Sequence, residues 1–131
     1  MCDDDFTDLR CVLRGCRHAP RYRYRILFIG EDRAALITYL NRKLEELDCH
    51  VSYVPSTELA HAFIKTDAEY HLLMFDERMP EATGAELVAF ARTVPHRAGT
   101  PCLVVPTDAT PENSGHLVEQ IKRVLAQAAP V

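Results

Sequence analysis

The stretch LLMFDERMP, residues 72–80, indicates the fold and raises the first question about function. An apolar run leads directly into Asp76, and a Met-Pro turn follows. A short, continuous apolar run is typical of a strand that is covered on both faces of a parallel sheet. Burying an unpaired carboxylate is unfavourable, so we expect Asp76 to emerge into a solvated cleft or to meet a cation there.

Around this stretch, the hydrophobic pattern alternates between short strands and amphipathic helices. Strands are predicted at 26–29, 50–54, 71–75 and 101–105, and helices at 31–48, 55–66, 84–94 and 114–127. Asp32 is placed to cap the first helix. In the second helix, Leu59, Ala62 and Phe63 are predicted to face inward. The order βαβαβαβα with short connections predicts a parallel sheet with helices on both faces.

Composition excludes several classes of function. With 131 residues, 47% of them hydrophobic and 26% charged, the chain suits one globular domain. A net charge of −4 gives no overall attraction to nucleic acid or to an anionic membrane. No apolar run is long enough to span a membrane, and the acidic start MCDDDF does not resemble a signal peptide. We therefore expect a cytoplasmic protein whose five cysteines are reduced thiols.

Acidic residues follow two strands that are expected to be neighbours. Glu31 and Asp32 come after the first strand, and Asp76 ends the third. Ligands of such sheets bind outside the carboxyl ends of the strands, so the three acids should lie together. Clustered carboxylates need a compensating cation, and hard oxygen ligands suit Mg²⁺. The alternative is that Asp32 only caps a helix and Asp76 only begins a loop.

The run DERMPEATGAEL, residues 76–87, resembles the phosphoacceptor segment of two-component response-regulator receiver domains. In that family an Asp ends the third strand, Met-Pro follows three residues later, and a Gly precedes an acidic residue and Leu at a helix start. The matching positions are Asp76, Met79, Pro80, Gly84, Glu86 and Leu87. With the opening ILFIGED, the resemblance extends over residues 25–107. It implies a flavodoxin-like (receiver), doubly wound parallel sheet.

The resemblance also implies site residues and partners. Mg²⁺ would be bound by Glu31, Asp76 and the backbone carbonyl of Arg78, with Asp32 as a further candidate ligand. Asp76 would be the phosphoacceptor, and the chain would have no other catalytic activity. A histidine kinase or an output protein would be the partner. We expect Asp76 to be partly exposed, close to Glu31 or Asp32, and Mg²⁺ to bind weakly.

Several positions depart from the family pattern. The family's acidic pair corresponds to Gly30 and Glu31, so one acid is missing. The phosphoryl-binding Thr or Ser corresponds to Pro106, and Thr107 lies one residue late. Only TDATPENS, residues 107–114, separates the fourth strand from the last helix. The family's fourth helix, fifth strand, aromatic switch residue and active-site Lys are therefore predicted to be deleted, because Lys122 lies within the last helix.

These departures predict a sheet truncated to about four strands and an altered function. We expect a degenerate receiver-like signalling module that acts through protein–protein interaction, with phosphorylation weak or absent. The alternative is a true phosphoacceptor that uses Asp76 with Mg²⁺ in a two-component phosphorelay.

The fourth strand should become an exposed edge, which is a template for association. We therefore expect a homodimer whose interface comprises Cys102, Leu103, Val104, Val105, Phe6, Leu9 and Leu13. The last three belong to an N-terminal extension, residues 1–22, with helical spacing that predicts either a docking helix or a tail. Residues 23–131 form the receiver-like domain.

Two weaker patterns lie near the N-terminus. The spacing of Cys2, Cys11, Cys16 and His18 matches no common zinc site. The stretch RYRYR, residues 21–25, mixes Arg with aromatic residues as some RNA-binding surfaces do, but it directly precedes a strand. We expect it to be a solvated lead-in to the sheet, and we expect no nucleic-acid or membrane binding.

Overall fold

The computed structural model describes residues 22–127 of the chain. The helix predicted around Phe6, Leu9 and Leu13, and the cysteines of that extension, lie outside the described residues. The described elements are, in chain order, β1 (Tyr24–Ile29), α2 (Ala34–Lys43), the 3₁₀ turn η1 (Glu45–Leu47), β2 (Cys49–Val54), the 3₁₀ turn η2 (Thr57–Leu59), α3 (Ala60–Lys65), β3 (Leu72–Asp76), α4 (Gly84–Thr93), β4 (Cys102–Val105), the 3₁₀ turn η3 (Pro111–Asn113) and α5 (Gly115–Ala126). Among them, no helix has the length and apolar character to cross a membrane.

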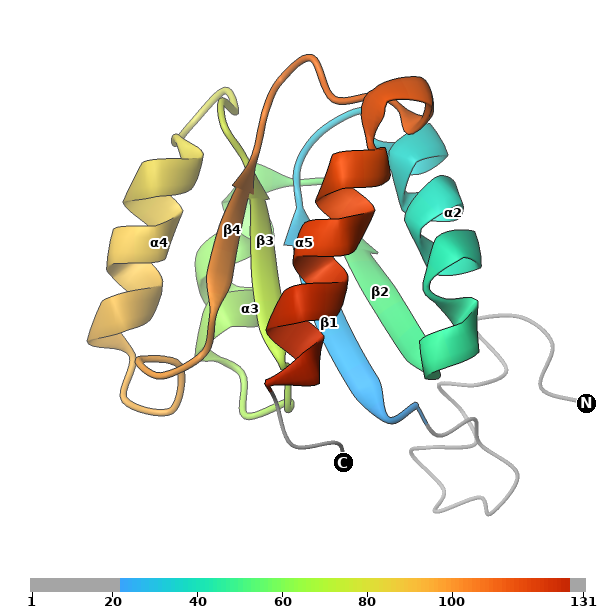
Figure 1. The fold of residues 1–131 in the computed structure, drawn as a ribbon. Coiled ribbons are helices and arrows are strands. Elements are labelled where there is room, and N and C mark those ends of the chain that lie inside the picture. The colour runs from blue at the N-terminus through green and yellow to red at the C-terminus, as the bar shows by residue number, and fades with distance from the viewer. Residues whose placement is uncertain (1–21, 128–131) are drawn as a thin grey trace, which may run out of the picture.

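The strands form one parallel sheet in the order β2-β1-β3-β4 (Figure 1). Ile26 pairs with Leu72 between the two central strands, and Asp76 pairs with Val105 at the carboxyl end of the sheet. Every residue of β3 is buried, as expected of a strand covered on both faces. The predicted parallel sheet of four strands is confirmed.

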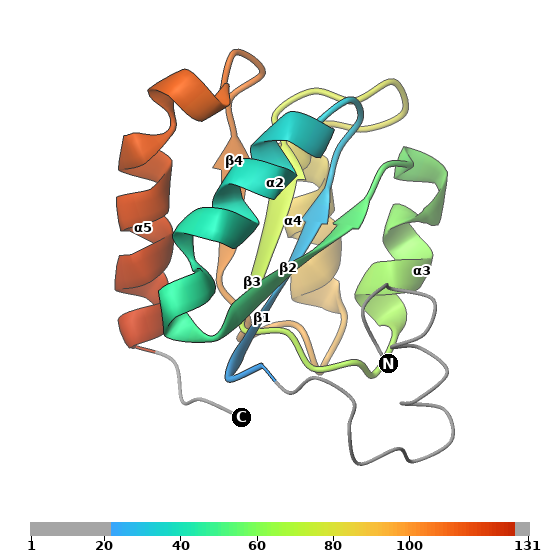
Figure 2. The same ribbon diagram turned by 90° about the vertical axis from the view of Figure 1, so that its right-hand side faces the viewer.

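Helices cover both faces of the sheet. α2 and α5 pack on one face, and α3 and α4 pack on the other (Figures 1 and 2). The alternation of side chains along each strand divides the core accordingly: Ile26 and Phe28 face the α2 and α5 side, and Leu27 and Ile29 face the α3 and α4 side. α5 is amphipathic, and its buried residues are Leu117, Val118, Ile121 and Leu125.

The start of α2 differs from the prediction. Asp32 does not cap the helix, because the N-cap residue is Arg33 and no side chain caps that end. Asp32 instead has a left-handed backbone, with φ of 55°. The single predicted helix over 31–48 is also divided, because α2 ends at Lys43 and the chain continues as the tight turn η1.

The residues of α3 and η2 that face the core differ from the prediction. Leu59 is 49% exposed and Ala62 is exposed, whereas Ala60 and Ile64 are buried. Phe63 is half-buried and packs against the core. The physical reason is the 3₁₀ turn η2 before α3: it has about three residues per turn, so it shifts the phase of the residues that meet the sheet.

The region after β4 is shortened as predicted. Within residues 22–127, β4 is followed only by η3 and α5, and the sheet has no fifth strand. β4 is therefore an edge strand. We call residues 106–114 the β4–α5 connection.

Candidate functional site

Asp76 is the last residue of β3, at the carboxyl end of the sheet. That position was predicted, but the predicted partial exposure was wrong, because Asp76 is only 3% exposed. A carboxylate so deeply buried needs a cationic partner. Of the two alternatives raised by the sequence, the structure therefore favours a cationic partner for Asp76 over a solvated cleft.

The cationic partner is Arg33. Its Nε lies 2.8 Å from Oδ1 of Asp76, and both side chains are largely buried. Oδ1 has no aligned hydrogen-bond donor among the described residues, so the contact is an ion pair and not an ideal hydrogen bond. The two Nη atoms of Arg33 donate to the carbonyl oxygens of Ala109, at 2.8 Å, and Pro106, at 2.9 Å. The guanidinium therefore bridges the end of β3 and the β4–α5 connection.

Two glycines allow close approach to Asp76. A Cβ atom on Gly30 would lie 2.3 Å from Oδ2 of Asp76, so the carboxylate occupies the space of a side chain at that position. A Cβ atom on Gly84 would lie 2.6 Å from the backbone oxygen of Asp76. A capping box between Thr83 and Glu86 fixes the start of α4 there. The missing acid at position 30 is thus a requirement of this packing.

Burial dominates the electrostatics of Asp76. It raises the pKa of the carboxyl above its ordinary value, because the charged form is desolvated. The close guanidinium of Arg33 and a backbone hydrogen bond from Glu31 oppose that rise. Glu31 is therefore close to Asp76, as predicted, but the contact that lowers the pKa comes from its backbone.

The other predicted site residues do not converge on the carboxylate. The side chains of Glu31, Asp32 and Arg78 are exposed. The backbone N–H and the hydroxyl of Thr107 both lie 3.3 Å from Oε1 of Glu77, so Thr107 donates to Glu77. In the part of the chain that the structure describes, no three His, Cys, Asp or Glu residues gather as metal ligands.

The family resemblance implies a magnesium ion at this position, and the residues present do not fit one in the observed arrangement. The buried oxygen of Asp76 already faces the guanidinium of Arg33. Arg33, which was not among the predicted site residues, is the residue that pairs with Asp76. Its signal in the sequence was a cation directly after the two acids, at the start of α2.

The residues of the predicted interface strand β4 range from buried to exposed. Val105 is inaccessible, while Leu103 and Cys102 are half-buried and pack against opposite faces of the core. Val104 is 42% exposed and lies on the α4 side of the sheet. Of the four predicted interface residues in β4, only Val104 offers a largely exposed side chain.

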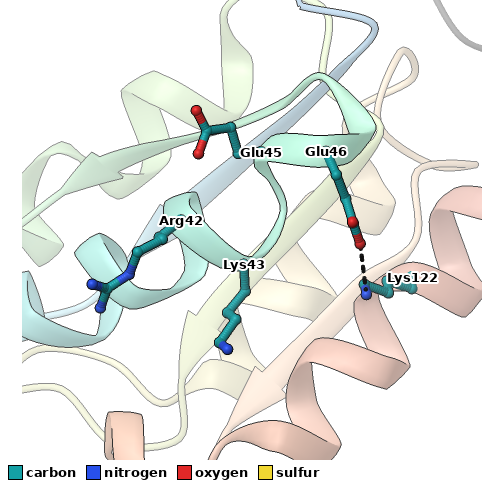
Figure 3. Close-up of a pocket in the computed structure, with 5 residues that line it drawn as sticks. All are labelled: Arg42, Lys43, Glu45, Glu46 and Lys122. Carbon is teal, nitrogen blue, oxygen red and sulfur yellow. Dashed lines mark hydrogen bonds and ion pairs between the residues drawn. The ribbon is translucent and has the colours of Figure 1, made fainter.

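A hollow lies at the end of the sheet opposite to Asp76, between the C-terminal end of α2 and α5 (Figure 3). It has a volume of about 530 Å³ and is lined by Arg42, Lys43, Glu45, Glu46 and Lys122. Nζ of Lys122 lies 3.2 Å from Oε1 of Glu46, and both side chains reach solvent. Charges of both signs around an open hollow indicate a solvated surface and no particular ligand.

Neither a protein-family model nor a curated protein matches the sequence. Solved structures do match. The non-phosphorylated HemR receiver domain from Leptospira biflexa has a TM-score of 0.61 at 16% identity, with 82% of this chain and 98% of that chain covered. A CheY-like response regulator receiver domain protein from Methanospirillum hungatei JF-1 gives 0.60 at 22% identity, covering 79% and 94%.

The receiver domain of the hybrid histidine kinase CckA gives a TM-score of 0.57 at 24% identity, covering 77% of this chain and 98% of that chain. At these identities the similarity establishes the fold. The chain has the CheY-like, flavodoxin-type fold of response-regulator receiver domains, with a sheet of four strands.

Proposed function

We propose that this chain is a degenerate receiver-like module that acts in signalling through protein–protein interaction, with phosphorylation of Asp76 weak or absent. The observation that carries the proposal is the closed state of Asp76, which is 3% exposed and paired with Arg33. A phosphoryl donor has to reach a carboxylate oxygen in line with its leaving group, and this carboxylate is covered.

The charge of a phosphorylated site supports the same conclusion. An aspartyl phosphate adds nearly two negative charges that have to be stabilised. Near Asp76, Arg33 is the ion-pairing cation and its Nη atoms are already bound to backbone carbonyls. The hydroxyl of Thr107 is engaged with Glu77. The side-chain donors of Arg33 and Thr107 are therefore already engaged, which disfavours a phosphoryl group at this site.

The alternative is a true phosphoacceptor in a two-component phosphorelay. Arg33 is the observation in its favour, because a guanidinium can bind phosphoryl oxygens in a bidentate manner if it leaves the carbonyls. Under this reading, Mg²⁺ would bind at Glu31, Asp76 and the carbonyl of Arg78, with Asp32 assisting, after the ion pair opens.

Intact mass spectrometry after incubation with acetyl phosphate and Mg²⁺ separates the two readings. We expect no phosphoryl adduct on the wild type, and no shift in its mass with beryllofluoride. Asp76→Asn is the control for adducts at other residues. A stoichiometric adduct on the wild type that Asp76→Asn abolishes would establish the phosphoacceptor instead.

We propose further that the module is a cytoplasmic homodimer whose interface includes β4, with a histidine kinase or an output protein as a further partner. The open edge of β4 and the exposed Val104 support this assembly. Phe6, Leu9 and Leu13 are proposed to contribute. Sedimentation should report a dimer for the wild type and a shift toward monomer for Val104→Lys. A wild-type monomer at micromolar concentration would contradict the dimer.

A further inference from the structure

Arg33 connects parts of the chain that are far apart in sequence. Its side chain bonds to the carbonyls of Pro106 and Ala109, which are 73 and 76 residues away. Its backbone N–H donates to the hydroxyl of Tyr53, at 2.8 Å. With the ion pair to Asp76, each of its three side-chain nitrogens has an oxygen partner.

The partners of the guanidinium have a common chemistry. A carboxylate oxygen and two backbone carbonyl oxygens are hard oxygen ligands of the kind that Mg²⁺ and Ca²⁺ accept. Here, a planar guanidinium takes that place, and its fixed fork of donors can bond to several oxygens at once. The positive charge that the carboxylate requires is thus supplied by the chain itself.

The surrounding backbone is fitted to this arrangement. Gly30 leaves room for the carboxylate of Asp76, since a Cβ there would meet both Oδ2 and Cγ within 2.6 Å. The left-handed Asp32 turns the chain directly before Arg33. One local unit therefore surrounds Asp76: Gly30 has no side chain, Asp32 turns the chain, and Arg33 supplies the cation.

The β4–α5 connection depends on this unit. Within the connection, the carbonyl of Thr110 accepts from the hydroxyl of Ser114, and the N–H of Thr110 donates to Oδ1 of Asn113. These bonds hold η3 together locally. Its side-chain hydrogen bonds to the sheet end come from Arg33 and, at greater length and exposure, from Thr107 to Glu77, and Ala109 also packs against the core. Arg33 therefore provides the largely buried hydrogen-bonded attachment of the connection.

We infer that Arg33 is a built-in cation that takes the place of a divalent metal beside Asp76, closes the cleft to such metals, and anchors the β4–α5 connection. Arg33 is a positioning residue in this role. The inference concerns metal exclusion and local order, so it holds or fails independently of the dimer and of phosphorylation.

The first test is a double-mutant cycle between Arg33→Met and Asp76→Asn. Arg33→Met leaves a buried, unpaired carboxylate and should lower the folding equilibrium constant on the order of a hundredfold. Asp76→Asn added to it removes that charge and should recover most of the loss. The matched control is Arg42→Met, on the exposed side of the same helix, which should change little. Additive losses in the double variant would overturn the pairing.

Amide hydrogen exchange follows the connection in the same variants. Arg33→Met should accelerate exchange in residues 106–114 by about tenfold or more relative to the rest of the sheet, because a buried anchor is lost. Arg42→Met should leave these amides unchanged. Unchanged exchange in Arg33→Met would show that Arg33 does not anchor the connection.

Mn²⁺ titration, read by paramagnetic relaxation, tests metal exclusion. The wild type should bind Mn²⁺ weakly at most, and Arg33→Met should bind it about tenfold more tightly, a change of about 1.4 kcal/mol. The gain should disappear in the variant that also carries Asp76→Asn. Equal binding by the wild type and Arg33→Met would show that Arg33 does not close the cleft, and would overturn the inference.

Discussion

The closed cleft at Asp76 and the open edge at β4 are adjacent, yet the first is shielded from solvent and the second is exposed to it. Asp76 pairs with Val105 in the sheet, and both residues are buried. One residue earlier, Val104 is 42% exposed on a strand with no outer partner among the described residues. Truncating a receiver fold after its fourth strand therefore has two separate consequences.

The difference shows which of these consequences the chain itself compensates. The cleft contains a charge, and an unpaired buried charge is very unfavourable, so an internal cation and a short connection close it. An exposed strand edge is tolerated in water, because its backbone groups are hydrated there. Among the described residues, the chain thus supplies a partner for the charge where solvent is excluded, and no strand covers the edge of β4.

The largest effect is expected at Gly84, where the two regions meet. A Cβ there would lie 2.6 Å from the backbone oxygen of Asp76 and 2.9 Å from Cγ1 of Val104. The backbone oxygen cannot move aside easily, so Gly84→Ala should lower the free energy of unfolding by about 3 kcal/mol. Chemical denaturation measures the change.

Gly115→Ala is the matched control for that measurement. Gly115 also begins a helix, but no atom lies within 4 Å of its Cβ position. Since Ala is the better helix former, this variant should be as stable as the wild type or more stable. Equal losses in the two variants would show that the close approach at Gly84 does not matter.

A smaller loss is expected from Gly30→Ala, which tests the cleft alone. The nearest obstructing atoms belong to the side chain of Asp76, which can rotate away if the pair with Arg33 opens, and Cε1 of Phe28 follows at 3.0 Å. We expect a loss of about 1–2 kcal/mol. Asp76→Asn should not relieve it, because the amide has the same size. Relief by Asp76→Ala, measured in the same denaturation experiment, would locate the clash at that side chain.

The pH dependence of the cleft should have an unusual sign for a paired carboxylate. Because the pKa of Asp76 is raised on folding, its contribution to stability is full below the ordinary carboxyl value of 3.8 and is lost as the pH rises through the folded pKa. The stability of the wild type relative to Asp76→Asn should therefore fall as the pH rises through that acidic range.

The same measurement distinguishes burial from pairing. Arg33→Met removes the interactions that lower the pKa, so the fall should extend to higher pH in that variant. If the stability of the wild type relative to Asp76→Asn instead rose with pH, pairing with Arg33 would outweigh burial in the folded protein.

The smallest change in stability is expected at the edge. Val104→Lys places a charge on an already exposed position, so the free energy of unfolding of the monomer should change by less than about 0.5 kcal/mol. Val105→Ala, at the next and fully buried position, should cost about 2 kcal/mol. Comparable losses in the two variants would mean that the edge is covered in solution by this chain.

The sheet could be predicted from sequence because strands buried on both faces are continuous apolar runs. LLMF at 72–75 and CLVV at 102–105 have that pattern, and both lie in the predicted strands. The start of α4 was also predictable, since the position of Glu86 three residues after Thr83 is the signature of a capping box. These features depend on residues that are near one another in the chain.

The closed state of Asp76 could not be predicted in the same way. Asp76 and Arg33 are far apart in sequence. The cation after the two acids is visible in the sequence, but its local pattern does not show that Arg33 will fold toward β3 instead of into water. The predicted inward orientation of Leu59 was wrong for a different reason. A tight 3₁₀ turn and an α-helical turn share the same composition, yet they differ in the direction of each side chain.

The order in which the chain is synthesised gives the placement of α5 a kinetic meaning. The face covered by α3 and α4 has nearly its whole buried cluster by residue 94, whereas the opposite face needs Leu117 to Leu125. On the ribosome, Ile26, Phe28 and Met74 therefore remain without α5 until the last helix has emerged. A nascent chain stalled before that helix exposes a half-covered sheet, which is the kind of apolar surface that chaperones bind.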